Sequence, residues 1–299
     1  MGQPFRLAVT ADVHHDVAKS RAAAEELART WPTTDADALL IAGDAATSDE
    51  RHLEEALSLF ADDGRPRLFL PGNHEYWSRI DKTDVHQLLR RELPRRVRDC
   101  GWHWLPGDPW RDGDVAVVGT SGWYDYGFAD EGLGLPIRFY RDKLSPAAAA
   151  YVSGNDLRPG ADDVPEHARS FFARWNDARF IQGLTDDTLF CRERAESLRK
   201  DLQAVSEAER VAVGVHVCPT NDLLPRRPSG AIPPDRLKYA FARAYLGSPI
   251  FGDVATTFRN VRHVVCGHSH IAREATRGDV QLTNVGSGYT EKRMIVLEL

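Results

Sequence analysis

Pairs of side chains that can bind a metal ion follow two apolar runs of this sequence. In "VVCGHSH" the residues His268 and His270 stand two positions apart behind a glycine, and in "LAVTADVH" the residues Asp12 and His14 repeat that spacing. Side chains two positions apart on an extended segment point to the same side. Each pair is therefore expected to present two donor atoms to one point.

Three further apolar runs end in residues of the same kind. They supply Asp44 after "LLIAG", Asn73 and His74 after "LFLPG", and His216 after "VAVGV". Each segment alone is also compatible with a polar turn or a buried histidine, whereas five such run ends are hard to explain by chance. Carboxylate, amide and imidazole donors together suit Mn, Fe or Zn better than Mg²⁺ or Ca²⁺. Their number exceeds the needs of one tetrahedral ion and suits two divalent ions that share a carboxylate.

Short apolar runs alternate in this sequence with longer segments of helical pattern, which is typical of an α/β fold. In open α/β sheets the ligand site lies beyond the carboxyl ends of the strands, so donors from distant segments can converge there. Residues from about 123 to 190 are rich in aromatic residues, Gly and Pro, which predicts an elaborated insertion within a single domain spanning 1–299. Strands are expected at 5–10, 36–43, 67–72, 114–121, 210–216, 262–267, 278–285 and 293–299, and helices at 19–30, 49–61, 84–93 and 192–205.

The composition is that of an ordinary globular protein, with 42% hydrophobic and 27% charged residues in 299. The formal net charge of −6 gives no general attraction to nucleic acid or to an anionic membrane. The sequence has no start typical of a signal peptide and no run of about eighteen apolar residues, so a cytoplasmic location is expected.

The four cysteines are widely spaced and predict neither a disulfide framework nor a structural zinc site. Nothing in the composition indicates an oligomeric state.

The ordered motifs Asp-x-His, Gly-Asp, Gly-Asn-His-Glu, a single His and Gly-His-x-His resemble those of the calcineurin-like metallophosphoesterase superfamily. In this sequence they extend from residue 12 to residue 270. The resemblance implies a four-layer αββα sandwich of two mixed β-sheets flanked by helices, with a dinuclear metal centre at the strand ends. It assigns the bridging role to Asp44. The remaining ligands would divide as Asp12, His14 and His270 for one ion and Asn73, His216 and His268 for the other.

The same resemblance implies a metal-dependent phosphoesterase, from a bacterial branch whose substrates are undefined. The two ions would activate a hydroxide for attack on phosphorus, and His74 would face the substrate and protonate the leaving oxygen. The expected substrate is a monoester or diester of a small phosphorylated or nucleotide-like molecule. The alternatives are a nuclease of the same superfamily, against which the acidic net charge counts, and a non-catalytic binding or scaffold module that retains the fold.

One motif departs from the protein-phosphatase branch of the superfamily. There the Gly-Asp motif continues Gly-Asp-x-x-Asp-Arg-Gly, and its second Asp pairs with the histidine that corresponds to His74. This sequence reads "GDAATSDE", with Thr47 in place of that Asp. The difference argues against a Ser/Thr protein phosphatase and leaves His74 without its usual partner. Asp49 or Glu50 could take that role, or both could simply be acids at the start of a helix.

Two groups of residues are candidates for substrate binding. Trp123, Tyr124 and Tyr126 could stack on a base or sugar, or could form the small core of the insertion. Arg226 and Arg227 lie in the proline-rich segment "CPTNDLLPRRPSG". They could grip a phosphate, or could belong to a solvated loop. The sequence leaves both sets of alternatives open.

Overall fold

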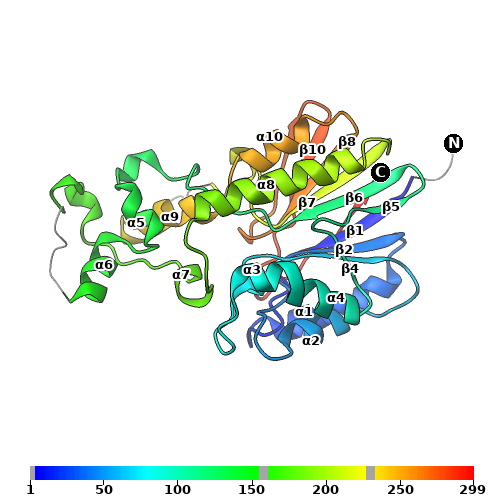
Figure 1. Cartoon of the computed structure of the whole chain (residues 1–299), viewed down its shortest axis with the longest axis horizontal. Helices are drawn as coiled ribbons and strands as arrows, with labels where there is room; N and C mark the ends of the chain where they lie inside the picture. Colours follow the sequence, from blue (N-terminus) through cyan, green and yellow to red (C-terminus); the bar gives the residue numbers. More distant parts are fainter. Residues whose placement is uncertain (1–3, 155–160, 227–232) are drawn as a thin grey trace.

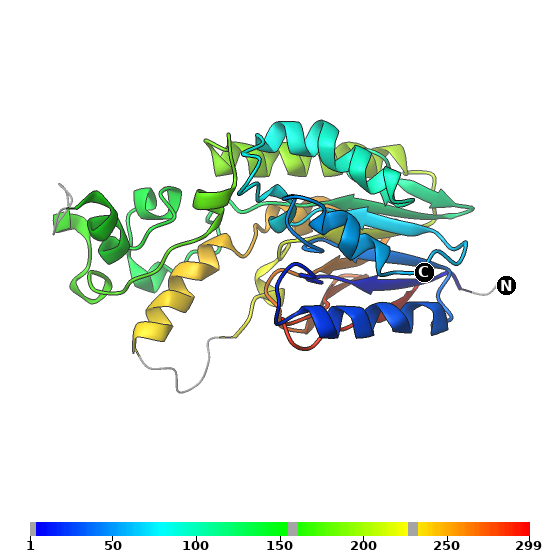
Figure 2. The same cartoon turned by 90° about the horizontal axis from the view of Figure 1, so that it is seen from below.

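The computed structural model describes residues 4–154, 161–226 and 233–299. Two β-sheets pack face to face, and helices cover the outer face of each sheet, so that four layers result (Figure 1 and Figure 2). The αββα sandwich implied by the motifs is thus confirmed. In the described parts of the chain, no helix combines the length and the apolar character needed to cross a membrane.

The first sheet has the strand order β11-β1-β2-β3-β4. Strands β1 to β4 run parallel, and β11 pairs antiparallel with β1 at the edge. These strands are β1 (Arg6–Thr10), β2 (Ala38–Ala42), β3 (Arg67–Leu70), β4 (His103–Trp104) and β11 (Ile295–Glu298). The helices on its outer face are α1 (Arg21–Thr30), α2 (His52–Ser58), α3 (Val85–Gln87) and α4 (Leu93–Asp99), with a π-helical turn joining the last two.

The second sheet has the strand order β5-β6-β7-β8-β10-β9. Its four central strands run parallel, and both edge strands are antiparallel to their neighbours. The strands are β5 (Trp110–Asp112), β6 (Val115–Thr120), β7 (Arg210–Val215), β8 (Val261–Cys266), β9 (Arg273–Arg277) and β10 (Val280–Asn284). Helices α8 (Asp187–Ala204) and α10 (Ile250–Thr256) pack together on its outer face (Figure 1).

The core has one apolar layer between the sheets and another beneath the helices of each. Leu40 belongs to the layer between the sheets, whereas Leu39 and Ile41 belong to the layers under the helices. Because successive side chains of a strand point to opposite faces, a strand buried on both faces must be apolar at every position. This explains why the central strands read as continuous apolar runs in the sequence.

Glycine allows the two sheets to approach closely. A Cβ atom on Gly214 of β7 would lie 2.5 Å from a methyl carbon of Leu70, and one on Gly119 of β6 would lie 2.7 Å from the Cβ of Leu105. Alanine at either position would force the sheets apart, because distances this short do not occur between packed carbon atoms.

A lobe extends beyond one end of the sandwich, and both chain termini lie at the other end (Figure 1). It contains α5 (Ile137–Arg141), α6 (Pro146–Ser153), α7 (Asp177–Phe180) and α9 (Pro233–Ala242). Most of the lobe comes from the segment expected as an insertion at about 123–190. The boundaries of a single domain with one insertion stay a prediction.

Each strand expected from the sequence is present, and three short or polar strands were not expected. Strand β9 reads "REATR" and alternates between exposed and half-buried residues at the edge of its sheet. It therefore lacks the apolar run by which the other strands were recognised. The expected helix at 84–93 continues to Asp99, and α9 and α10 were not expected.

Candidate metal centre

The candidate ligands converge at the end of the sandwich that the lobe covers, just beyond β1, β2, β3, β7 and β8. Within each of three overlapping groups, one donor atom per residue lies within 4.8 Å of the others. Both sheets contribute ligands, because the parallel strands in each sheet terminate at this edge. The groups are Asp12, His14 and His270; His14, Asp44 and His74; and Asp44, His216 and His268.

The backbone at these residues is strained. Among the described residues, nine that are not glycine have a positive φ, and five of those nine are candidate ligands. This left-handed conformation is uncommon for side chains with a Cβ and tends to persist at functional sites. It turns the chain sharply after β1, β2 and β8. The five ligands are Asp12 (54°), His14 (46°), Asp44 (55°), His268 (63°) and His270 (60°).

The carboxylate of Asp44 lies between two groups of imidazoles. Its Oδ1 atom is 3.3 Å from Nε2 of His216, and its Oδ2 atom is 3.7 Å from Nε2 of His14. The side chain is almost completely buried. One oxygen therefore faces each group, which is the arrangement a ligand shared by two ions needs.

The first group joins β1 to β8. Nε2 of His270 lies 3.5 Å from Oδ1 of Asp12 and 3.3 Å from Nε2 of His14. Nε2 of His14 lies 4.0 Å from the same Asp12 oxygen. These donor atoms surround one point and belong to residues far apart in the chain.

The second group contains two imidazoles whose tautomers are fixed by backbone carbonyls. Nδ1 of His216 donates to the carbonyl of Ala42 at 2.9 Å, and Nε2 of His268 donates to the carbonyl of Tyr245 at 3.2 Å. The opposite nitrogens of the two rings then face each other at 3.2 Å. Metal-binding histidines commonly donate their other ring N–H in this way.

Asn73 is the residue expected to complete the second group, and it provides a test of whether a cation fits. Its Nδ2 atom donates to Oδ1 of Asp177 at 2.9 Å, which fixes the orientation of the amide. Its Oδ1 atom is buried and has no hydrogen-bond partner in the described structure. A buried carbonyl oxygen without a partner is costly, and a cation bound at this position would satisfy it. The residues present therefore fit a metal ion.

The electrostatics of the site favour cations. Burial, followed by the neighbouring His74, lowers the pKa of His14 well below its usual value. Burial and the neighbouring His216 lower the pKa of His268 to about 3. Although burial opposes it, Asp44 raises the pKa of His216 to about 10. Neutral imidazoles are the form that coordinates a metal ion, so a cation that binds His216 would displace the proton that pairs this ring with Asp44.

Glu75 holds the loop after β2 against the loop after β3. Its buried carboxylate accepts backbone N–H groups of Gly72 (2.6 Å), Ala45 (2.7 Å), Asp44 (3.0 Å) and Ala46 (3.2 Å). Burial and the neighbouring Asp44 raise the pKa of this carboxyl to about 8. The sequence analysis included Glu75 in a motif but gave it no role. Its position directly after two candidate site residues was the available signal.

The ring of His74 is oriented by stacking. It lies on the indole of Trp77, with ring centroids 3.7 Å apart, and meets the edge of His14 at 4.5 Å. Its Nε2 atom is 3.9 Å from Oδ2 of Asp44. His74 therefore borders the ligand groups.

Neither acid expected to orient His74 contacts it. Asp49 accepts a hydrogen bond from Nε of Arg79 at 2.8 Å, and Glu50 lies 3.6 Å from His52. Nδ1 of His74 is buried and has no hydrogen-bond partner among the described residues. Of the two alternatives left open for Asp49 and Glu50, the structure favours the one in which they lie near the start of α2 and do not orient His74.

A cavity of about 300 Å³ opens over the ligand groups. Its floor consists of candidate site residues, and part of its wall comes from the lobe. Aromatic side chains supply much of the remaining wall. The lining residues are Asp44, Asn73, His74, Trp77, Arg174, Trp175, Asn176, His268, His270 and Tyr289.

Asp177 of the lobe connects this wall to Asn73. The carboxylate is buried and accepts four side-chain hydrogen bonds, which are those from Asn73 (2.9 Å), Trp77 (2.7 Å), Trp175 (2.8 Å) and Tyr124 (3.0 Å). The sequence analysis missed this residue. The signal was an acid in a tryptophan-rich segment, because buried indole and phenol groups need an acceptor.

The aromatic residues expected to bind substrate lie in the core. Trp123 and Tyr124 are fully buried, Tyr126 is 6% exposed, and none of them lines the cavity. Trp123 and Tyr126 donate hydrogen bonds to the carboxylate of Asp187, beneath the lobe. Stacking on a substrate is therefore corrected to the core alternative, since these rings have no accessible face.

Of the two arginines expected to bind phosphate, Arg226 does not line the cavity over the ligand groups. Arg226 is exposed and lines a separate pocket of about 600 Å³ beside Arg243 and Arg273. Arg227 lies outside the described residues. The structure thus brings all seven expected ligands and His74 together, and none of the expected substrate-binding residues that it describes lines the cavity above them. The individual ligand roles stay predictions.

Solved structures of other proteins are similar to this chain in fold. A phosphopantetheinyl hydrolase from Mycobacterium tuberculosis has 20% identity and a TM-score of 0.64, covering 99% of this chain and 97% of its own. A dimetal phosphatase from Danio rerio has 13% identity and a TM-score of 0.52, covering 100% and 93%, respectively. The protein TT1561 of Thermus thermophilus has 13% identity and a TM-score of 0.52, covering 99% of each chain.

At these identities the solved structures demonstrate a shared fold. The search of curated protein sequences gives no match. The family model for calcineurin-like phosphoesterases matches residues 5–272, which include every candidate ligand. This chain therefore belongs to the calcineurin-like phosphoesterase family.

Proposed function

We propose that this phosphoester hydrolase uses a dinuclear metal centre and acts on a monoester or diester of a small phosphorylated or nucleotide-like molecule. The observation that carries the proposal is the position of Asp44. Its two oxygens face two different groups of donors, at 3.3 Å from His216 and 3.7 Å from His14. A single-ion site would have no need of such an arrangement.

The donor set supports Mn, Fe or Zn rather than ions that prefer oxygen alone. Bound divalent ions supply activation of water and neutralisation of the phosphoryl oxygens. The orphaned Oδ1 of Asn73 supports a cation beside that residue. One ion would be held by Asp12, His14 and His270, the other by Asn73, His216 and His268, and both by Asp44.

The protein's own groups then hold the substrate and move one proton. His74 borders the ligand groups, and its stack on Trp77 directs the ring toward the cavity. As imidazolium it would donate its proton to the departing oxygen, a general-acid role that typically contributes about 10²- to 10⁴-fold. Glu75 keeps the loops that bear Asp44 and Asn73 at a fixed separation.

The cavity supports a small substrate. Its volume of about 300 Å³ is at the lower end of the range for small-molecule sites. The net charge of −6 offers no general attraction for long nucleic acid, so the nuclease alternative is not favoured. The complete set of donors counts against a scaffold module, in which such buried and strained residues would have no purpose.

The test begins with metal analysis of the purified protein. We expect about two equivalents of metal, and hydrolysis that is abolished by a chelator and restored by Mn²⁺, Fe²⁺ or Zn²⁺. The substrate panel contains phosphomonoesters, phosphodiesters and nucleotides. It includes a phosphopantetheinyl ester, because one structurally similar protein is described as a hydrolase of that group. Full activity with one ion would contradict the dinuclear centre, and metal binding without hydrolysis across the panel would favour the scaffold alternative.

A further inference from the structure

The rim of the cavity includes a short segment of the lobe that is held firmly in place. The backbone N–H of Trp175 donates to the carbonyl of Lys143 at 2.9 Å, and Arg174 forms a β-bridge with Leu144. The ring of Trp175 stacks on Tyr245 with centroids 4.9 Å apart and an interplanar angle of 12°. This segment is therefore a fixed part of the wall and needs no ordering when a ligand binds.

Two tryptophans that line the cavity donate hydrogen bonds to the same carboxylate. The indole N–H groups of Trp77 and Trp175 both donate to Asp177, at 2.7 and 2.8 Å. A third aromatic ring, Tyr289, lies against His14 at a centroid distance of 5.0 Å. Fixed aromatic faces bind flat or apolar groups at low entropic cost.

Arg174 stands exposed on the same rim, and its guanidinium has no hydrogen bond or ion pair with any described residue. Some other arginines of the protein are paired with acids, as Arg138 is with Asp163 and Arg96 is with Glu54. Of the described residues that line the cavity, Asp44 is the one carboxylate, and its oxygens face imidazoles. A second anion at the rim would therefore meet an available cation without repulsion from a neighbouring acid.

We propose that Arg174 binds a second phosphate of the substrate, carried on the same small molecule as the ester that is hydrolysed. This inference rests on the proposed function and narrows its substrate class. The substrate would be a phosphoester with a separate phosphate group and a flat or apolar body between the two. In this proposal the body would lie along the wall formed by Trp77 and Trp175, and the second phosphate would lie at the rim, where Asn176 follows them in the lining of the cavity.

The expected contribution is moderate because the rim is open to water. A guanidinium can bind a phosphate through two parallel hydrogen bonds, which a lysine ammonium cannot reproduce. Solvent screening reduces the strength of such a contact at an exposed position. We therefore expect Arg174 to change substrate preference about 10-fold, which corresponds to about 1.4 kcal/mol.

The experiment compares paired substrates with the metal-loaded protein. For a monoesterase the pair is adenosine 5′-monophosphate and adenosine 3′,5′-bisphosphate. For a diesterase the pair is thymidine 5′-(4-nitrophenyl phosphate) with and without a 3′-phosphate. The wild type should prefer the member with the second phosphate in kcat/KM, mainly through a lower KM. Arg174→Ala should reduce that preference about 10-fold, and Arg174→Lys should restore only part of it.

Arg179→Ala is the matched control. Arg179 is exposed in the same segment, lies over the ring of Phe180 at 5.0 Å, and does not line the cavity. Its removal should leave the preference unchanged. An equal effect of Arg174→Ala on both members of the pair would overturn the inference while leaving the proposed function intact.

If the wild type hydrolyses neither member of the pair, a binding measurement tests the role of Arg174 separately. Titration of the metal-loaded protein with adenosine 3′,5′-bisphosphate, followed by tryptophan fluorescence, would report on Trp77 and Trp175. Binding that is about 10-fold weaker in Arg174→Ala supports the second-phosphate site. Equal affinity in wild type, Arg174→Ala and Arg179→Ala overturns it.

Discussion

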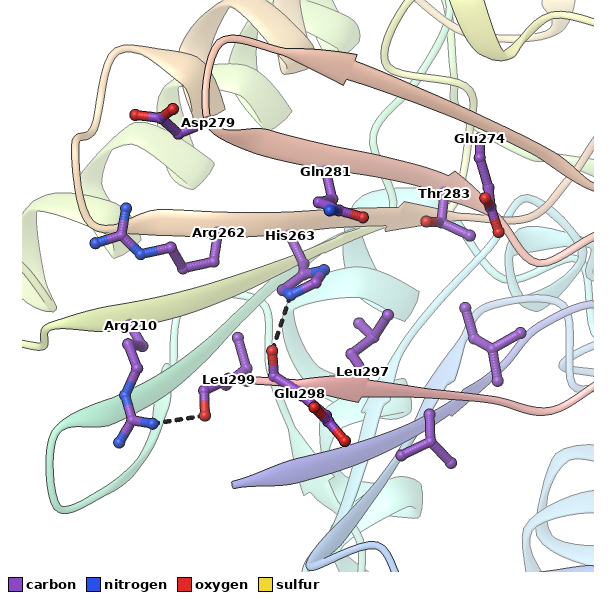
Figure 3. Close-up of a pocket in the computed structure, with 12 residues that line it drawn as sticks. Arg210, Arg262, His263, Glu274, Asp279, Gln281, Thr283, Leu297, Glu298 and Leu299 are labelled. Carbon is purple, nitrogen blue, oxygen red and sulfur yellow. Dashed lines mark hydrogen bonds between the residues drawn. The ribbon is translucent and has the colours of Figure 1, made fainter. Parts of the chain in front are cut away.

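Two cavities in the described part of this protein differ in size and in chemistry, and the smaller one, over the ligand groups, has the features of a functional site. The larger cavity, of about 590 Å³, lies between β8, β10 and β11 (Figure 3). There Nε2 of His263 bonds to the carbonyl of Glu298 at 3.1 Å, and Arg210 donates to the carbonyl of Leu299 (Figure 3). The smaller cavity instead has an orphaned oxygen on Asn73.

The larger cavity follows from the unequal width of the two sheets. The second sheet has six strands and the first has five, and β11 is an edge strand opposite β8 and β10. Gln281 is exposed and Thr283 is half-buried on β10, so neither side chain is held in a buried donor group. No described residue that lines this cavity has a positive φ outside glycine or belongs to a donor group. Volume alone therefore does not identify the site.

The largest expected effect comes from replacing Asp44. Asp44→Asn removes the negative charge between the two donor groups, so metal occupancy and turnover should fall together. We expect a loss greater than the roughly 10²- to 10⁴-fold typical of a missing general acid. The matched control is Asp279→Asn, which neutralises a carboxylate of the larger cavity and should change neither quantity. A metal stoichiometry near two with unimpaired turnover in Asp44→Asn would remove Asp44 from the bridge.

The next effect separates the histidines of the smaller cavity by role. His268→Ala and His270→Ala should deplete metal and activity together. His74→Ala should retain metal and lose about 10²- to 10⁴-fold in kcat on an ester with an alkoxide leaving group. The loss should be much smaller on a nitrophenyl ester, whose leaving oxygen needs little protonation.

Bound metal and both ester types are measured in all three variants. Loss of metal in His74→Ala, or an equal rate loss on the two esters, contradicts the general-acid role. Full metal occupancy in His268→Ala and His270→Ala contradicts their role as ligands.

A smaller effect is expected from Asp177, which has no counterpart in the larger cavity. Asp177→Asn replaces an acceptor by an amide that must also donate, so the donors of Asn73, Trp77, Trp175 and Tyr124 can no longer all be satisfied. We expect the ion beside Asn73 to bind about 10- to 100-fold more weakly, as when other partners of metal ligands are changed. The measurement is metal stoichiometry as a function of added Mn²⁺.

Asp187→Asn is the control for this prediction. Asp187 is also buried and accepts hydrogen bonds from Trp123, Tyr126 and Lys143, but it does not contact Asn73. Both variants should melt at a lower temperature, and only Asp177→Asn should need more metal. Equal metal affinity in the two variants would make Asp177 a structural residue alone.

The sequence predicted which candidate ligands converge because each lies just beyond a strand. The carboxyl ends of parallel strands meet at one edge, so the apolar runs locate Asp12, Asp44 and His216 without any knowledge of long-range packing. The central strands were found for the same reason, since strands buried on both faces are apolar throughout. Strand β9 was missed because its edge position permits charged residues.

The surroundings of the ligands could not be predicted in this way. Asp177 lies 104 positions from Asn73, and their contact depends on how the lobe folds back over the sandwich. Trp123 and Tyr124 showed the converse error, because an aromatic cluster has the same pattern whether it lines a cavity or fills a core. The position of a donor relative to its strand thus indicates which donors meet, whereas long-range packing determines which side chains surround them.

The smallest expected effect lies in the larger cavity and concerns pH. Burial lowers the pKa of His263 below 6.5, although its bond to the carbonyl of Glu298 opposes the shift. The unfolded chain therefore takes up this proton more readily than the folded protein, and stability falls as pH drops below 6.5. His263→Gln keeps an N–H donor and removes the titration, so between pH 7.5 and pH 5.5 its melting temperature should fall less than that of the wild type. The difference should be no more than the roughly 2–4 °C that 1 kcal/mol produces in a chain of this size. Metal content and turnover at pH 7.5 should be unchanged, and a loss of either in His263→Gln would mean that the larger cavity also contributes to the site.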